Sequence, residues 1–221
     1  MNFMENGTNF DLETKKVRKL MQAENKDEMR DKILEAALRR FTHYGAAKTT
    51  MNEIADDLHC SKASLYYYYP DKNAMHIAVL QKIAESFFSE MEEEARNVKS
   101  ATRALERIIE IRETFLTKFC RLEIFKILQN PSPTILEEME KAKKREIEIH
   151  TQVIKAGVQS GEFKVKHPGK TAELLVLAVN GLRFSVPNHV RPDMEMDDEL
   201  FAEIIDKQKQ LLEIFIKGMK A

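Results

Sequence analysis

Apolar residues recur along this chain at spacings of three and four, the period of a helix that buries one face. The pattern predicts helices over about 26–44, 51–58, 62–68, 72–98, 101–119, 122–129, 135–160, 169–186 and 197–218. Only seven glycines and six prolines occur in 221 residues, and Glu, Lys, Leu, Ile and Ala are abundant. Both observations favour an all-α chain.

Two short predicted helices, 51–58 and 62–68, follow each other closely. Thr50 and Glu53 form a capping box at the start of the first helix. Ser61 is a good N-cap for the second helix. The connector has room only for a tight turn, so the pair predicts a helix-turn-helix, whose second helix enters the major groove of DNA.

A run of four tyrosines ends the second short helix. At helical spacing Lys62 lies beside Tyr66 and Ala63 beside Tyr67, and together they form one exposed face. Leu65 points to the other side. A short helix with a polar, aromatic outer face and one inner leucine is more typical of a DNA-reading helix than of a packed core helix.

These residues resemble the DNA-binding domain of the tetracycline-repressor (TetR) family of bacterial regulators, over about residues 27–85. The matching motifs are Phe41-x-x-x-Gly45, Thr49-Thr50-x-x-x-Ile54-Ala55 and Ser61-Lys62-Ala63-Ser64-Leu65-Tyr66-Tyr67-Tyr68-Tyr69-Pro70-Asp71-Lys72. The resemblance implies a homodimer, an N-terminal three-helix DNA-binding head, and a long helix that joins it to a larger helical ligand-binding and dimerisation domain.

The resemblance also implies a set of DNA-binding residues. They are Thr49, Thr50, Asn52, Ser61, Lys62, Ala63, Ser64, Tyr66, Tyr67 and Lys72. The positions of Tyr66 and Lys72 usually grip phosphates, and that of Asn52 can reach a base. The sequence departs from the family at His59-Cys60, where a small residue or glycine is commoner. It departs again at Tyr69, where phenylalanine is usual, so this hydroxyl needs a partner or water.

Three segments are expected: an N-terminal extension (1–25), a helix-turn-helix DNA-binding domain (26–85), and a ligand-binding and dimerisation domain (86–221). The extension carries Lys15, Lys16, Arg18 and Lys19. A frayed tail is favoured there, and a basic arm that reaches phosphates or the minor groove is the alternative. The predicted helix 72–98 has apolar residues on more than one face, which suits a mechanical link between the domains.

A small-molecule pocket is expected among the helices of 101–186. The candidate lining residues are Phe115, Phe119, Phe125, Leu128, Met139 and Phe184. Each of them also suits an ordinary core position, which is the more frequent use of such residues. An apolar or amphipathic ligand is the expectation that the family resemblance supplies.

The last two predicted helices carry apolar stripes that suit a four-helix interface between two subunits. The candidate interface residues are Leu174, Ala178, Gly181, Leu182, Phe201, Ile205, Leu212 and Phe215. Packing of both stripes inside one chain is the alternative. Family resemblance favours the dimer.

Other functions find little support. The sequence has no glycine-rich phosphate loop, no HExxH and no nucleophile elbow, so we expect neither an enzyme nor a cofactor. Its two cysteines lack metal-ligand spacing, and no targeting or membrane-spanning segment is visible, which favours the cytoplasm. Oxidation of Cys60 beside the reading helix is a minor alternative to a structural thiol.

A non-specific nucleic-acid binder is usually basic, so the net charge of −1 points to specific, dimer-dependent binding of an operator rather than broad electrostatic attraction. We therefore expect a sequence-specific transcriptional regulator, usually a repressor in this family, released from a palindromic operator by a small molecule. One alternative is a ligand-independent architectural or protein-recruiting DNA binder of the same fold. Another is a helical interaction protein that no longer binds DNA.

Overall fold

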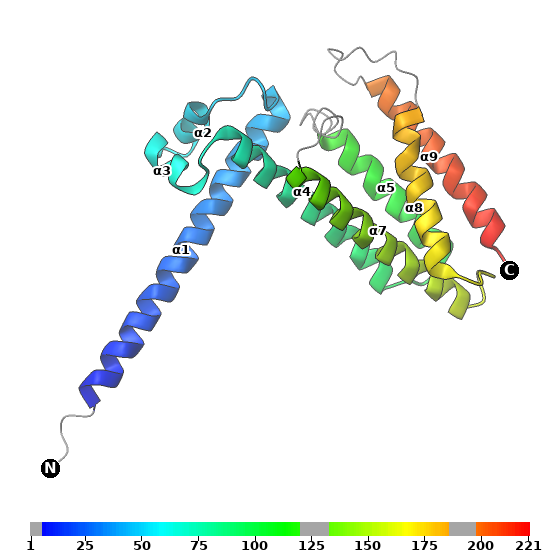
Figure 1. The fold of residues 1–221 in the computed structure, drawn as a ribbon, viewed down its shortest axis with the longest axis horizontal. Coiled ribbons are helices and arrows are strands. Elements are labelled where there is room, and N and C mark those ends of the chain that lie inside the picture. The colour runs from blue at the N-terminus through cyan, green and yellow to red at the C-terminus, as the bar shows by residue number, and fades with distance from the viewer. Residues whose placement is uncertain (1–5, 120–132, 186–197) are drawn as a thin grey trace. The chain divides into compact units, whose positions relative to one another are not determined.

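The computed structural model describes residues 6–119, 133–185 and 198–221, and these ranges form an all-α chain (Figure 1). Their helices are α1 (Asn6–Tyr44), α2 (Met51–Asp57), α3 (Lys62–Tyr68), α4 (Lys72–Arg96), α5 (Ala101–Phe119), α7 (Pro133–Gln159), α8 (Pro168–Ser185) and α9 (Asp198–Met219). The all-α expectation is confirmed. The helix expected over 122–129 lies outside the described residues.

The helix ends follow the caps expected from the sequence. The ends of α2 to α5 and of α7 to α9 fall within two residues of the predicted bounds. Gly45 and Gly161 have φ angles of 85° and 80°, a left-handed conformation that suits glycine after a helix. Asp71 accepts a 2.7 Å hydrogen bond from the N–H of Ala74 and so caps α4, as expected.

The frayed tail expected for residues 1–24 is wrong for residues 6–24, because α1 begins at Asn6 and continues without a break to Tyr44. No proline interrupts this stretch, which is rich in Lys, Glu, Leu, Met and Gln, all good helix formers. The apolar period that marks a packed helix starts only near residue 26, so the periodicity alone missed the first five turns.

The chain separates into two compact units, residues 1–80 and 81–221, and α4 continues from the first into the second. In the first unit α1 packs on α2, and α2 packs on α3. Phe41, expected as the central core residue of this unit, is fully buried. Its largest other fully buried side chains are Ile33, Ile54, Leu65 and Met75. This small core fixes the helix-turn-helix on α1.

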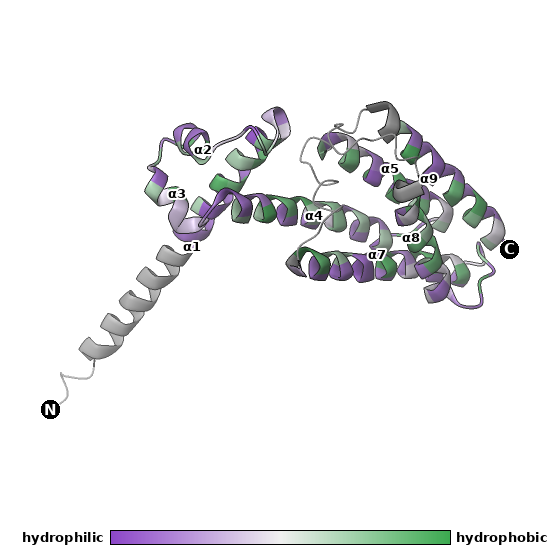
Figure 2. Ribbon diagram, turned by 45° about the horizontal axis from the view of Figure 1, so that its top comes forward, coloured by the Kyte–Doolittle hydropathy of each residue, from purple (hydrophilic) through white to green (hydrophobic). Residues whose placement is uncertain are grey.

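In the second unit α5, α7, α8 and α9 pack on one another, and α4 adds Phe88, Met91 and Ala95 to their core. Figure 2 shows α7 with extensive hydrophilic colour and α8 with mainly hydrophobic colour. The start of α5 is held by Glu162, whose carboxylate accepts hydrogen bonds of 2.7 and 2.8 Å from the N–H groups of Ala101 and Thr102. No helix in the described ranges combines the length and apolar character needed to cross a membrane.

Candidate nucleic-acid interface

The helix-turn-helix has the capping contacts expected from its sequence. The N–H of Thr50 donates to Oε2 of Glu53 (2.7 Å), and the N–H of Glu53 donates back to Oγ1 of Thr50 (3.3 Å). Oγ of Ser61 accepts from the N–H of Ser64 at 3.1 Å, which caps α3. In the turn, His59 has a φ of 51°, a left-handed conformation that glycine adopts more readily than other residues.

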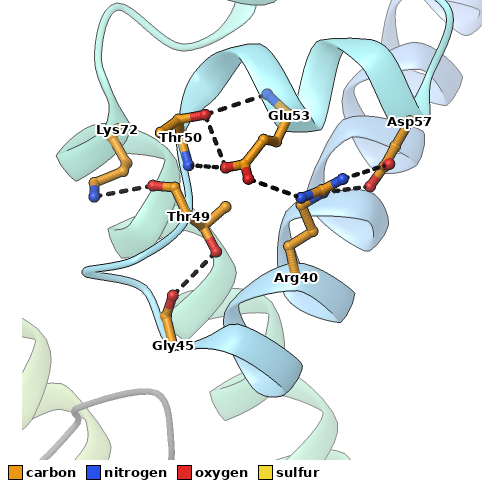
Figure 3. Close-up of polar contacts among 7 residues, drawn as sticks. All are labelled: Arg40, Gly45, Thr49, Thr50, Glu53, Asp57 and Lys72. Carbon is orange, nitrogen blue, oxygen red and sulfur yellow. Dashed lines mark hydrogen bonds and ion pairs between the residues drawn. The ribbon is translucent and has the colours of Figure 1, made fainter.

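Arg40 of α1 joins α2 to the rest of the first unit (Figure 3). Its guanidinium donates twice to the carboxylate of Asp57, over 2.6 and 2.8 Å, and lies 3.4 Å from Glu53. The hydrogen bond from Arg40 lowers the pKa of Asp57, and the hydrogen bonds from Thr50 lower that of Glu53. Both acids therefore hold the fold together, so the presence of acids in the motif does not argue against binding of DNA.

Lys72 and Thr49 brace the loop that leads into α2 (Figure 3). The ammonium of Lys72 donates to the carbonyl oxygens of Ala46 (2.9 Å), Ala47 (3.1 Å) and Thr49 (3.1 Å). Thr49 is buried, and its hydroxyl donates to the carbonyl of Gly45 at 3.0 Å. Both residues thus have structural contacts that the sequence did not indicate. Their contact with DNA remains a prediction.

The outer face of α3 is the exposed face expected from its spacing. Tyr67 is 69% exposed and Tyr66 is 40% exposed, whereas Leu65 on the inner side is fully buried. Lys62 and Ala63 are exposed, and the ammonium of Lys62 lies 5.8 Å from the centre of the Tyr66 ring. Asn52, Thr50 and Ser61 are exposed as well, and Ser64 is half-buried. A cation and two phenols therefore stand together on a short, well-anchored helix.

Two cations of α1 lie against tyrosines at the end of the second short helix, Tyr67 of α3 and Tyr69 directly after it. Arg30 donates from Nε to the hydroxyl of Tyr69 at 3.2 Å, which supplies the partner that this buried tyrosine was expected to need. The ammonium of Lys26 lies 5.2 Å from the centre of the Tyr67 ring. Sequence reasoning missed both residues, although their spacing of four places them on one face of α1.

The second helix, α3, is exposed, carries a cation and is held by α2 across a tight turn. This arrangement defines a helix-turn-helix DNA-binding protein. Residues 33–79 match the family described as bacterial regulatory proteins, tetR family. Residues 121–221 match the C-terminal region of QacR-like proteins. This chain belongs to the TetR family of transcriptional regulators.

Known proteins agree with this assignment over different parts of the chain. A transcriptional regulator from Cytophaga hutchinsonii has a TM-score of 0.78 and 32% identity over 86% of this chain and 97% of its own. QacR of Staphylococcus aureus is 27% identical over 164 residues, which are 70% of this chain and 84% of QacR. RutR of Escherichia coli is 43% identical over 53 residues, and this match spans 24% of the chain and only 25% of RutR.

The second unit brings part of the expected pocket together. The rings of Phe115 and Phe119 lie 5.2 Å apart, and the Phe115 ring lies 4.6 Å from that of Phe87 on α4. Met139 is half-buried on α7. The expected residues Phe125 and Leu128, and the side chain of Phe184, lie outside the described residues.

A buried polar network beside these rings was not expected from the sequence. Arg112 of α5 pairs with Glu146 of α7, and it donates to Oδ1 of Asn180 on α8 at 3.3 Å. Asn180 in turn donates to Oε2 of Glu146 at 3.1 Å. The guanidinium carbon of Arg112 lies 5.8 Å from the centre of the Phe87 ring. Three helices are thus joined by charged and amide groups at the edge of the aromatic cluster.

His150 and Gln208 extend the polar core. His150 is buried, and burial, together with the charge of Arg112, lowers its pKa to about 3. Its Nδ1 lies 2.8 Å from the carbonyl oxygen of Glu146, which can only accept, so Nδ1 carries the proton. Gln208 donates to the carbonyl of Val179 at 2.9 Å, and its buried Oε1 has no hydrogen-bond partner among the described residues.

The expected dimer residues divide into an exposed and a buried group. Leu174 is 60% exposed, and Ala178, Gly181 and Leu182 on the same helix are half-buried. Two large apolar side chains outside the expected set, Leu177 (49%) and Ile214 (66%), are exposed too.

The remaining expected dimer residues lie on α9. Ile205 and Leu212 are buried within one chain, so for these two the structure favours the alternative of inward packing. Phe215 is half-buried, and the side chain of Phe201 lies outside the described residues.

Proposed function

We propose that this chain is a dimeric repressor that binds a palindromic operator through α3 and leaves it when a small molecule binds residues 81–221. The observation that carries the proposal is the exposed outer face of α3, with Lys62, Tyr66 and Tyr67 above a fully buried Leu65. Exposed aromatic side chains that stand together on one face are typical of a surface that binds a partner. Lys62, Ala63, Ser64 and Tyr67 would read bases, and Tyr66 would hold a phosphate.

The dimer is proposed through the exposed side of α8 and α9. Leu174 and Leu177 lie three residues apart on α8, and Ile214 adds a third exposed apolar side chain on α9. Burial of these side chains against a second copy would remove them from water. Two heads held in this way would place two α3 helices about 34–36 Å apart, as successive major grooves require.

We further propose that the effector binds near the aromatic cluster of Phe87, Phe115 and Phe119, where Arg112 and Glu146 are within reach. An apolar or amphipathic molecule suits this mixture of rings and a buried ion pair. Release of DNA requires that the effector bind more tightly to the conformation that does not fit the operator. A ligand-independent DNA binder remains the second candidate.

Selection of bound duplexes from a random library by the purified protein tests the DNA function. A near-palindrome with half-sites about one helical turn apart supports it, and the absence of any enriched motif contradicts it. The recovered operator, labelled with a fluorophore, then serves to screen small molecules for release. If no compound releases the DNA, the ligand-independent candidate is favoured.

A further inference from the structure

The ring of Tyr67 on α3 is widely exposed, yet two neighbours contact it. The ring of half-buried Tyr68 meets it edge to face, with 5.1 Å between the ring centres and 88° between the ring planes. The ammonium of Lys26 on α1 lies 5.2 Å from the centre of the Tyr67 ring, within the range of a cation–π contact. Exposed side chains ordinarily exchange rotamers quickly. These two contacts therefore restrict a ring whose exposure alone would leave it free to turn.

The position of Lys26 is fixed by its own helix. Arg30, one turn further along α1, donates from Nε to the hydroxyl of Tyr69 at 3.2 Å, and its guanidinium carbon lies 5.5 Å from the centre of that ring. Tyr69 is buried, so this contact anchors α1 beside the end of α3. Residues four apart lie on one face of a helix. The face of α1 that holds Tyr69 therefore also brings Lys26 to Tyr67.

The contact of Lys26 with Tyr67 differs in kind from that of Lys62 with Tyr66. Lys62 and Tyr66 belong to the same short helix, so their contact moves with α3 as a unit. Lys26 belongs to α1, whose later turns carry the fully buried Phe41 of the core of this unit. The Tyr67 ring is thus tied to that core through a second helix as well as through its own backbone.

We propose that Lys26 is a positioning residue for base recognition, whose ammonium holds the ring of Tyr67 in the orientation that meets one base pair of each operator half-site. The inference rests on the proposed reading of an operator by α3. A ring that turns freely adjusts to a wrong base pair at little cost, whereas a ring that is held clashes with it and rejects it more strongly. Lys26 therefore increases discrimination at one position without touching a base.

The test measures the affinity of the full-length protein for the selected operator and for duplexes with each single base-pair substitution in the half-sites. Preference is the ratio of two such affinities, so a uniform loss from the missing charge cancels. Tyr67→Leu identifies the position that Tyr67 reads, because preference is lost there. Lys26→Met is expected to lower preference at that position alone, by about two- to fivefold, the contribution of an exposed cation–π contact.

Two further variants separate positioning from a general effect of charge. Lys26→Met should have no further effect on preference when Tyr67→Leu is already present, because the two changes remove the same contact. Lys26→Arg, which keeps the cation, should keep the wild-type preference. The control Lys32→Met removes the same charge from another face of α1, where Lys32 is exposed and lies 3.6 Å from Glu28. It should leave every preference unchanged.

The inference is overturned if Lys26→Met weakens all duplexes by one factor and leaves the preferences unaltered, since its role is then electrostatic only. Altered preference at positions that Tyr67→Leu does not affect, or an unaltered preference in Tyr67→Leu itself, overturns it too. Absence of any preference in the wild-type protein would instead contradict the proposed function. Lys26 and Tyr67 are both exposed, so their variants should keep the wild-type stability, which urea unfolding checks.

Discussion

Single residues of the first unit act as helix caps or make polar contacts between distant parts of the chain, and the sequence revealed only the caps. Thr50, Ser61 and Gly45 were predicted correctly because caps act on neighbours a few positions away. The partners of Lys72 and Arg40 lie 17 or more residues away, so no local pattern indicated them. Long-range polar contacts of this kind become visible only when the helices are packed.

Lys72→Met should therefore lower the stability of the first unit in addition to weakening DNA binding. Loss of three hydrogen bonds from its ammonium is expected to lower the free energy of unfolding by about 1–3 kcal/mol. Urea unfolding measures the change, with Lys62→Met at an exposed site as the control that leaves stability unaltered. Unaltered stability of the Lys72 variant would show that these carbonyls do not need the ammonium.

His150 should make the second unit sensitive to mild acid. Its pKa is about 3 in the folded protein and about 6.5 in an unfolded chain, so only the unfolded chain takes up a proton between these values. The free energy of unfolding should fall as the pH drops below 6.5, by up to about 1.4 kcal/mol per unit. Urea unfolding at pH 7, 6 and 5 measures the slope. The variant His150→Gln should show a smaller slope, and an identical slope would refute this assignment.

At the scale of helices, the sequence predicted well where each helix begins and ends. It predicted poorly which face of a helix packs against which neighbour. Apolar periodicity and caps located α2, α3 and α5 closely, because both signals are local. The same periodicity could not tell which stripe of α8 and α9 packs inward. Leu175 and Leu212 are buried, whereas Leu174 and Ile214 on the same two helices are exposed. That choice depends on how α5 and α7 cover them.

Gly157 of α7 lies in close contact with the start of α5 and with the loop that follows α7. A Cβ atom there would lie 2.7 Å from the Cβ of Ala101 and closer still to the ring of Phe163. Gly157→Ala should lower the free energy of unfolding by about 1–3 kcal/mol, because helix and loop would have to separate. Thermal unfolding measures the loss. Gly218→Ala is the control, since nothing lies within 4 Å of an added Cβ and alanine favours helix. Equal effects of the two substitutions would contradict the close packing.

At the scale of the whole molecule, the proposed function depends on assembly of two copies, and exposed apolar surface is the sign of it that a single chain displays. Leu174→Asp/Leu177→Asp is expected to give a monomer and to abolish operator binding, because one head alone loses the second half-site. Analytical ultracentrifugation measures the oligomeric state. Leu136→Asp, which alters a side chain 52% exposed on α7, should leave the dimer intact. A dimeric Leu174/Leu177 variant would place the interface elsewhere.

The most direct test of the central claim, that the outer face of α3 reads DNA, repeats the random-library selection with two variants of that face. Lys62→Ala is expected to relax the recovered motif at particular positions of each half-site, because a base contact is lost. Tyr66→Phe is expected to keep the motif and to weaken binding to all duplexes alike, because only a phosphate contact is lost. If both variants return the unaltered motif with unaltered affinity, α3 does not read the operator.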